Sequence, residues 1–194
     1  GGDTSYREIP VEIEAADLLY AAKGYDPKAV GEDRNSLIPI DRLLEYQANS
    51  VLGSLNSAWW SVSSFIPDAN AVAEILAPSL VDRIKFYRIQ AVLLIPASKL
   101  CHQTLGIVAR AIEASGIPTI NISVDSKITD QVRPPRTAYY KGNFGSVAGE
   151  PNWPEYQLRI VDETLRLMET FDQPGSRKLS VIQQSQGEAA RGER

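Results

Sequence analysis

The chain has 194 residues and a mass of 21.3 kDa, which fits one full-size domain and leaves little room for two. Hydrophobic residues make up 43% and charged residues 23% of it, so a disordered, collagen-like or coiled-coil chain is excluded. The net charge of −4 at pH 7 argues against nucleic acid as the main partner, because binding to a phosphate backbone needs a basic face.

Three residue types occur once each, as Cys101, His102 and Met168. One cysteine excludes an internal disulfide framework and a multi-Cys metal site, one histidine excludes a His-rich centre, and we expect no metal. A free thiol fits a reducing compartment, and no segment resembles an export signal or a membrane span, so we expect a cytoplasmic protein with no membrane partner. Because the chain does not begin with Met, we expect a processed chain or a fragment of a longer one.

The N-terminal third shows extended and irregular patterns. Tyr6–Ile13 alternates loosely and predicts a strand, which Pro10 restricts to the edge of a sheet. Residues 23–39 are rich in turn-forming residues and predict a wrapping loop. The spacing then predicts a short helix over Ile40–Asn49 and an extended segment over Gly53–Ile66.

The middle of the chain begins with apolar residues at helical spacing. They predict an amphipathic helix over Asp68–Arg88, capped by Asp68 or Asn70. Pro78 lies inside this pattern, so we expect it to kink or divide the helix.

A strand–helix–strand unit follows. Ala91–Pro96 is a continuous apolar run, which is typical of a strand buried on both faces. His102–Ser115 predicts an amphipathic helix that ends at Gly116, and Pro118–Val124 predicts a second strand. The connections between these three elements are too short for anything but a parallel crossover.

The alternation continues towards the C-terminus. Arg136–Tyr140 predicts a strand, residues 142–154 a glycine-rich loop, and Glu155–Phe171 a helix. Residues 175–194 have no sustained apolar period, so we expect this tail to be mobile or to lie on a partner.

These patterns together predict an α/β fold with a small parallel sheet and flanking helices, built from flavodoxin- or Rossmann-like strand–helix–strand units. We expect residues 1–174 to form a single domain, with a wrapping N-terminal part over residues 1–66 and an α/β core over residues 67–174.

The candidate site lies in the turn between the predicted strand Ala91–Pro96 and the helix that follows it, because ligands of parallel sheets bind at the carboxyl ends of the strands. If the helix begins near His102, Cys101 occupies or adjoins its N-cap, where free N–H groups and the positive helix end stabilise a thiolate. Lys99 adds charge of the same sign. A nucleophilic or redox thiol is one interpretation, and a small buried hydrophobic residue is the other. Ser98 alone indicates only a loop serine.

The residues after the cysteine suggest supporting roles. His102, Gln103 and Thr104 are expected in the first helical turn, where they line a pocket or satisfy helix caps. A Cys–His dyad is weakly indicated, since adjacent residues need not face each other. The same loop type is compatible with anion binding by backbone amides.

A second candidate region lies between residues 133 and 154. Arg133 and Arg136 flank two prolines, whose fixed backbone would hold a guanidinium at a defined angle for a substrate carboxylate. Gly145 and Gly149 indicate close backbone approach or positive φ. Surface arginines and ordinary turns are the alternative interpretation.

The order and spacing of several stretches resemble the selenoprotein B family of glycine, sarcosine, betaine and D-proline reductases. The resemblance covers most of residues 5–172. It is carried by the following stretches: Pro39-Ile40-Asp41-Arg42-Leu43, Leu52-Gly53-Ser54-Leu55, Phe65-Ile66-Pro67-Asp68, Val92-Leu93-Leu94-Ile95-Pro96, Cys101-His102-Gln103-Thr104-Leu105-Gly106, Gly116-Ile117-Pro118-Thr119, Pro134-Pro135-Arg136 and the loop with Gly145, Ala148, Gly149 and Pro151.

The resemblance implies a redox pair, with selenocysteine or cysteine three residues before the cysteine of the Cys-His-Gln run. Cys101 matches the second member, and the first falls on Ser98. The implied reaction is reductive cleavage of a carbon–nitrogen bond, beside a partner subunit whose pyruvoyl group holds the amine as an imine, with no cofactor in this chain. Serine cannot form a selenide-sulfide or a disulfide, so the two-electron cycle is not available to the sequence as it stands. A second departure is Ser146, where the family often carries histidine.

Three hypotheses follow. In the first, the chain is a subunit of a selenoprotein-B-like reductase acting on a small amine or amino acid, with Cys101 as nucleophile, Ser98 in the selenocysteine place, and His102, Gln103, Thr104, Arg136 and Arg133 around the substrate. In the second, it is a non-catalytic or regulatory subunit that has lost the redox pair. In the third, it is a thiol- or metal-dependent lyase or hydrolase.

Overall fold

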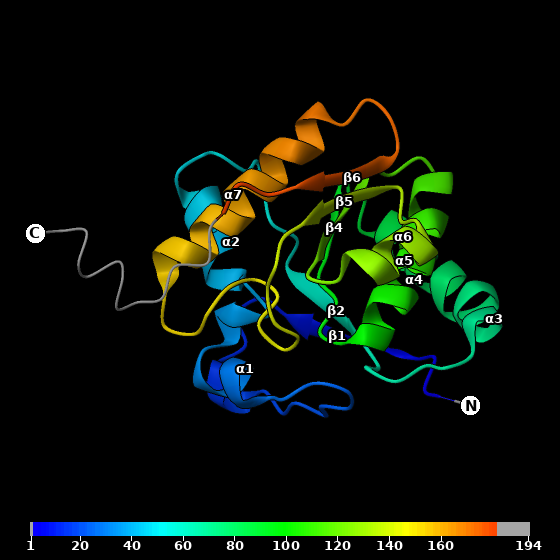
Figure 1. The fold of residues 1–194 in the computed structure, drawn as a ribbon, viewed down its shortest axis with the longest axis horizontal. Helices are drawn as coiled ribbons and strands as arrows, with labels where there is room; N and C mark the ends of the chain where they lie inside the picture. The colour runs from blue at the N-terminus through cyan, green and yellow to red at the C-terminus, as the bar shows by residue number, and fades with distance from the viewer. Residues whose placement is uncertain (1, 182–194) are drawn as a thin grey trace, which may run out of the picture.

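The centre of the fold is a four-stranded parallel sheet (Figure 1), seen in a computed structural model that describes residues 2–181. The strands lie in the order β3 (Val92–Leu94), β4 (Thr119–Ser123), β5 (Arg136–Tyr139) and β6 (Gly175–Lys178). All three pairings are parallel. The predicted α/β class and small parallel sheet are confirmed.

Helices cover both faces of this sheet (Figure 1). Helices α5 (Lys99–Ala114) and α6 (Ser126–Val132) pack against each other on one face. Helix α7 (Pro154–Thr170) packs on β4 and β5 and contacts α2 (Ile40–Ala48) on the other face. Within residues 2–181, no helix combines the length and the apolar character that a membrane span requires.

The burial of β4 explains why the sheet holds together. All five residues of β4 are buried, and alternate side chains enter different layers. Ile120 and Ile122 belong to the apolar cluster that contains Ile160 of α7. On the opposite face Thr119 donates both its backbone N–H and its hydroxyl to Glu113 of α5, each at 2.9 Å. The central strand is therefore fixed by apolar packing on one face and by hydrogen bonds on the other.

The N-terminal segment forms a separate antiparallel ribbon of β1 (Tyr6–Pro10) and β2 (Ala58–Val62). β1 pairs only with β2, which confirms that the first strand lies at an edge. The expected loop over residues 23–39 contains short helices, so that expectation is wrong in part. Four helices lie between the two strands: the 3-10 helix η1 (Ala15–Asp17), α1 (Lys28–Glu32), the 3-10 helix η2 (Arg34–Ser36) and α2.

The amphipathic helix predicted after residue 68 contains a π-helical turn. Asp68 caps it, because its Oδ1 accepts hydrogen bonds from Asn70 N and Ala71 N. Helix α3 (Ala69–Ala71) continues directly into the π-helical turn η3 (Val72–Leu76). Helix α4 (Ala77–Phe86) then carries Pro78 in its first turn, where a missing N–H costs little. The backbone is helical without a break from residue 69 to residue 86, so Pro78 does not divide the helix, although it directly follows the π-helical turn.

Three features depart from the sequence-based expectations. β3 is the edge strand of its sheet, and Val92 and Leu93 are only half-buried, so the prediction of a strand buried on both faces is wrong. Helix α6 was not predicted. Residues 175–178 form β6, and the adjoining Leu179 and Val181 are buried in the core, so the expected tail begins later than predicted. Residues 182–194 of that tail lie outside the described residues, and the division into a wrapping part and a core stays a prediction.

Candidate functional site

The turn from β3 into α5 is organised by Ser98, which is the N-cap of the helix. Helix α5 begins at Lys99 and not at His102, and Ser98 Oγ accepts a hydrogen bond from Cys101 N at 3.2 Å. The expectation that Cys101 occupies or adjoins the N-cap is therefore wrong, because the apolar pattern that marked the helix start omitted its polar first turn. A serine N-cap satisfies one of the N–H groups that a helix start leaves unpaired.

Cys101 lies in the first turn of α5, directly over that cap. Its Sγ is 3.1 Å from Ser98 Oγ and 3.7 Å from the carbonyl oxygen of Ser64. Cys101 is 5% exposed and Ser98 is 1% exposed. This burial shields the thiol from bulk water.

Three residues that the sequence did not single out cover this pair. Gly24 has φ +90°, and a Cβ placed on it would lie 3.5 Å from Ser98 Cβ, so the wrapping segment approaches the turn closely. Burial raises the pKa of Tyr25, and its electrostatic interaction with nearby Cys101 raises it further. Ser64 accepts a hydrogen bond from Lys23 N at 3.1 Å, which ties the two covering segments together. The sequence carried one signal for this cover, Gly24 within a turn-rich stretch.

His102 fixes the turn instead of facing the thiol. Its Nδ1 donates to the carbonyl oxygen of Ser98 at 2.7 Å, and its Nε2 accepts from Val124 N at 3.3 Å. The ring is 5% exposed and meets Phe144 edge-on, and burial lowers the pKa of the imidazole. Because both ring nitrogens are bonded to backbone groups, His102 does not form a dyad with Cys101. His102 thereby links the β3–α5 turn to the end of β4 through its two hydrogen bonds.

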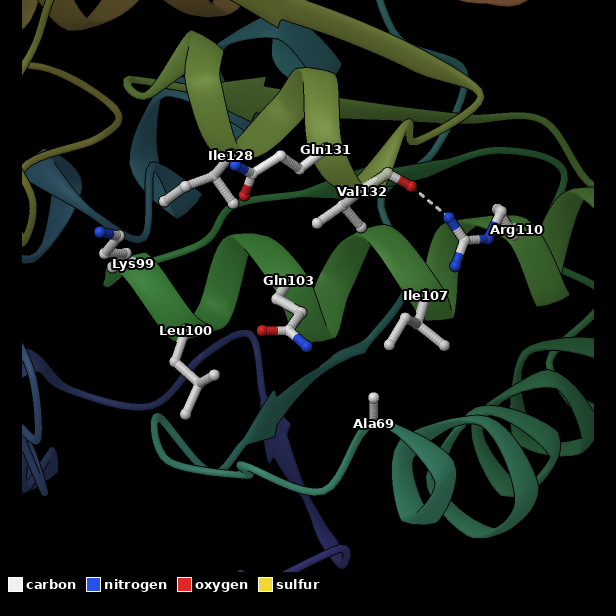
Figure 2. Close-up of a pocket in the computed structure, with 9 residues that line it drawn as sticks. All are labelled: Ala69, Lys99, Leu100, Gln103, Ile107, Arg110, Ile128, Gln131 and Val132. Carbon is white, nitrogen blue, oxygen red and sulfur yellow. Dashed lines mark hydrogen bonds between the residues drawn. The ribbon is translucent and has the colours of Figure 1, made fainter.

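Gln103 and Thr104 point in different directions. Thr104 is 1% exposed, inside the helix–sheet interface. Gln103 lies on the outer side of α5, in a groove of about 600 Å³ that also contains Lys99 (Figure 2). Residues two positions apart in a helix are about 200° apart around its axis, so Gln103 faces away from the cysteine. The structure therefore places Gln103 away from the thiol, whereas Thr104 is buried on the same side of α5 as Cys101.

Of the two predicted glycines, only one adjoins the site. Gly145 has φ +83° and donates its N–H to the carbonyl oxygen of Ala97 at 2.9 Å, directly before Ser98. A Cβ on Gly145 would lie 2.5 Å from the carbonyl oxygen of Asp26, so only glycine fits there. Gly149 packs against Gln157 of α7, where a Cβ would lie 2.9 Å from the Gln157 side chain, and it supports the loop from a distance.

The two arginines lie away from the thiol. Arg136 begins β5 and pairs with Glu113 at 3.7 Å. Glu113 is twelve residues beyond Cys101 on α5, which is about 18 Å along the helix axis. Arg133 is an exposed residue in left-handed conformation that ends α6. The structure therefore does not place either guanidinium beside Cys101.

A cavity of about 1490 Å³ reaches Cys101 from the side of the ribbon. Residues of β2 and of the β3 segment line it, with Leu105 of α5 near the thiol. Among residues 2–181, no three His, Cys, Asp or Glu side chains come together as they would to hold a metal ion.

Comparisons with known proteins identify relatives of this chain. The family model described as glycine/sarcosine/betaine reductase selenoprotein B matches residues 10–97. D-proline reductase subunit gamma of Acetoanaerobium sticklandii is 33% identical over 165 residues, which cover 85% of this chain and 68% of that protein. The chain belongs to the selenoprotein B family. Glycine reductase complex component B subunit gamma of Symbiobacterium thermophilum is 29% identical over 112 residues, 57% of this chain and 26% of that protein. No solved structure matches the chain.

Membership in the selenoprotein B family confirms the resemblance drawn from the sequence. Both named relatives are subunits of reductases. The family match ends at residue 97, one position before Ser98, so it does not extend to the pair at positions 98 and 101.

Proposed function

We propose that the chain is a subunit of a reductase that cleaves a carbon–nitrogen bond of a small amine or amino acid, with Cys101 as the reacting thiol. The observation that carries the proposal is the contact between Ser98 and Cys101, whose Oγ and Sγ are 3.1 Å apart in the first turn of α5. The names of the two relatives support the subunit and the reductase class.

The electron balance assigns a role to position 98. Cleavage of a carbon–nitrogen bond with two electrons and two protons leaves a C–H bond and a free amine. In a thiol-dependent cleavage, two sulfur or selenium atoms supply the electrons and become joined. This chain has one cysteine, so the second atom is either selenium or sulfur at position 98 in the reductase form, or the sulfur of an added thiol reductant. Ser98 Oγ supplies the helix cap and no electrons.

The remaining residues hold the pair in place. His102 fixes the carbonyl of Ser98, and Gly145 fixes the carbonyl of Ala97, so both peptide groups before the helix are held. The positions of four predicted site residues do not support contact with a substrate at Cys101. These residues are Gln103, Thr104, Arg133 and Arg136. A pyruvoyl group on a partner subunit stays a prediction from the family. In such a reaction this chain supplies the reacting thiol, that of Cys101.

The test is dithiothreitol-dependent cleavage of glycine, sarcosine, betaine and D-proline, each assayed separately, by the native complex purified through a tag on this chain. We expect Cys101→Ala to abolish cleavage of the accepted substrate, whereas Ile75→Ala, at a 58% exposed position that lines neither the turn nor the cavity at Cys101, retains it. Equal rates in the two variants would contradict the assignment of the thiol.

The codon for position 98 in the source gene is the matching genetic observation. A recoded stop codon there would mean that serine stands in place of selenocysteine and would support the two-electron cycle. An ordinary serine codon would assign the second sulfur to a thiol outside this chain.

One observation favours a second candidate, a regulatory subunit without its own chemistry. Cys101 is 5% exposed and Ser98 is fully used as a helix cap, which is a satisfied structural arrangement. This candidate predicts unchanged cleavage by the Cys101→Ala complex, so the same experiment separates the two.

A further inference from the structure

The thiol of Cys101 is enclosed, although the proposed function requires a substrate to reach it. Cys101 lines the large cavity beside the ribbon and is still only 5% exposed. Part of the wall of this cavity is formed by residues 19–24, which lie between η1 and α1 and which we call the strap. Tyr20 and Ala21 of the strap line the cavity together with the cysteine. A movement of the strap therefore changes access to the sulfur.

The backbone of the strap has little to hold it in place. Residues 19–24 belong to no helix or strand, and none of them is buried. Within residues 2–181, no hydrogen bond between two backbone groups involves any of these six residues. Leu19 is 96% exposed, so its apolar side chain does not fix the strap to the core. Segments with exposed backbone groups and little buried apolar surface open locally at a low cost in free energy.

The strap is tied to the rest of the fold mainly by one serine hydroxyl. Ser64 Oγ accepts a hydrogen bond from Lys23 N at 3.1 Å and donates one to the carbonyl oxygen of Ala21 at 3.2 Å. Across the described residues 2–181, these are the two hydrogen bonds that join the strap to a segment distant in the sequence. Lys23 Nζ also lies 3.7 Å from the centroid of the Phe65 ring.

The backbone of Ser64 contacts the thiol, whereas its side chain holds the strap. The carbonyl oxygen of Ser64 lies 3.7 Å from Cys101 Sγ and 3.4 Å from Ser98 Oγ. Gly24 of the strap packs over Ser98, where a Cβ on the glycine would lie 3.5 Å from Ser98 Cβ. Loss of the Ser64 hydroxyl therefore frees the strap and leaves the contacts of the Ser64 carbonyl in place.

Both ends of the strap are anchored, which confines a movement to the residues between them. Before the strap, Leu18 N donates to the carbonyl oxygen of Ala15 at 3.2 Å. After the strap, the ring of Tyr25 packs on Gly145, where a Cβ would lie 3.0 Å from Tyr25 Cδ2. Gly24 adjoins this second anchor with φ +90°, and glycine is the residue that changes its backbone angles most freely.

We propose that the strap is a lid over Cys101, which opens by a local movement and is held closed by the Ser64 hydroxyl. The inference rests on the proposed function, because a lid serves a thiol that a substrate has to reach. Opening exposes Ser98 and Cys101 to the substrate, and closing shields the reacting atoms from water.

The rate at which iodoacetamide alkylates Cys101 tests the lid on the full chain, because the chain has no other cysteine. We expect Ser64→Ala to raise this rate about tenfold or more, since the change removes both hydrogen bonds that hold the strap. Ser115→Ala is the matched control. The Ser115 hydroxyl donates to the carbonyl oxygen of Ile112 at 2.7 Å at the far end of α5, so its loss should leave the rate unchanged.

A second pair of variants tests the same closure through a different contact. Lys23→Met keeps the backbone N–H that bonds to Ser64 and removes the cation over the Phe65 ring. We expect alkylation to become about two- to fivefold faster, as for the loss of one exposed cation–π contact. Lys28→Met, at the exposed first position of α1, removes a lysine outside the strap and should leave the rate unchanged.

Urea separates a local opening from unfolding of the whole chain. We expect the alkylation rate of Ser64→Ala to stay constant at low urea concentrations, because a local opening exposes little new surface, and to rise only near the unfolding transition. A rate that rises from the lowest urea concentrations with the slope of global unfolding would overturn the lid.

The remaining outcomes keep the two proposals apart. Equal rates in the parent chain, Ser64→Ala and Lys23→Met, or no alkylation of any of them below the unfolding transition, would overturn the lid and leave the cleavage test of Cys101→Ala standing. Alkylation requires no turnover. A complex that cleaves none of the four substrates therefore contradicts the proposed function without altering the alkylation result.

Discussion

At the scale of single residues, the side chain at position 98 decides what chemistry the turn can perform. Its Oγ accepts the N–H of Cys101 and also lies against the thiol, so one atom serves as helix cap and as neighbour of the sulfur. Serine is among the best N-cap residues, which makes the present turn stable, and its oxygen offers Cys101 no second sulfur or selenium atom. A change of that single atom converts a cap into half of a redox pair.

Replacing Ser98 by Cys should create a reversible disulfide with Cys101. The 3.1 Å contact and the spacing of three residues at a helix N-terminus match the geometry of redox-active Cys pairs. We expect titration with a thiol reagent in denaturant to find two thiols after reduction and none after mild oxidation. Ser98→Ala is the matched control, with one thiol in both states and a loss of about 1 kcal/mol for the missing cap. Two titratable thiols after oxidation of Ser98→Cys would refute the placement.

His102 should make the stability of the fold depend on pH. Burial lowers the pKa of its imidazole, so the unfolded chain, with a His pKa near 6.5, takes up the proton first. The stabilisation is therefore complete above about pH 6.5 and is lost as the pH falls through the folded pKa. Urea unfolding at about pH 7.5 and about pH 5.5 should show a fall for the parent chain and a smaller fall for His102→Gln. Equal falls in both would assign the effect to other groups.

The sequence predicted the position of the turn that carries Cys101 and His102, but not the contacts that its side chains make. The strand-to-helix handover and the single Cys and His were visible, because the apolar run before them and the helical spacing after them are strong patterns. The direction of each side chain was not visible. His102 turned out to bond two backbone groups, and Arg136 to pair with Glu113 at the far end of the helix, since both depend on contacts between distant segments.

At the scale of elements, the packing of α6 on α5 depends on Gly106. A Cβ on Gly106 would lie 2.4 Å from Val132 Cγ1, so the two helices approach too closely for any larger residue. This contact also explains why α6 escaped prediction. It is a helix of seven residues with little apolar pattern, and its position is set by tertiary packing against a neighbour.

Gly106→Ala should destabilise the fold by about 1–3 kcal/mol, the usual range for overpacking, partly offset by the better helix propensity of alanine. Gly31→Ala, in helix α1 with no atom within 4 Å of the added Cβ, is the matched control and should be neutral or slightly stabilising. Thermal unfolding of both variants measures the difference. A stabilised Gly106→Ala protein would contradict the observed closeness of the helices.

The elements that sequence reasoning described best are those with a periodic apolar pattern. α5, α7, β4 and β5 were found because their apolar side chains are buried, those of α7, β4 and β5 in one cluster and those of α5 in the clusters on the other side of the sheet. β6 was missed because its four residues are all exposed, and only the paired backbone places them in the sheet. β3 was misjudged because its apolar run reflects the lining of a cavity and not burial between two layers.

At the scale of the whole molecule, the chain beyond β6 completes the core. Leu179 is 2% exposed and packs in the cluster that holds Ile120 and Ile160, and its N–H bonds to the carbonyl oxygen of Tyr139 at 2.8 Å. Residues near the end of the described chain therefore contribute to the same apolar cluster as the central strand.

Leu179→Ala should cost about 2–5 kcal/mol, as for other buried leucines, because it leaves a cavity in that cluster. Leu19→Ala, at a position that is 96% exposed, should change the free energy of unfolding by less than about 0.5 kcal/mol. Denaturant titration of both variants gives the comparison. Equal stability of the two would show that the end of the chain does not belong to the core.

The close cover over the turn also bears on how this protein changes over evolutionary time. Ser98 is 1% exposed beneath Gly24, so the space admits small side chains and little else. Serine and cysteine codons differ by one base, and both residues fit the same enclosure. A lineage can therefore lose the second sulfur or regain it by a point mutation, while the surrounding fold remains as it is.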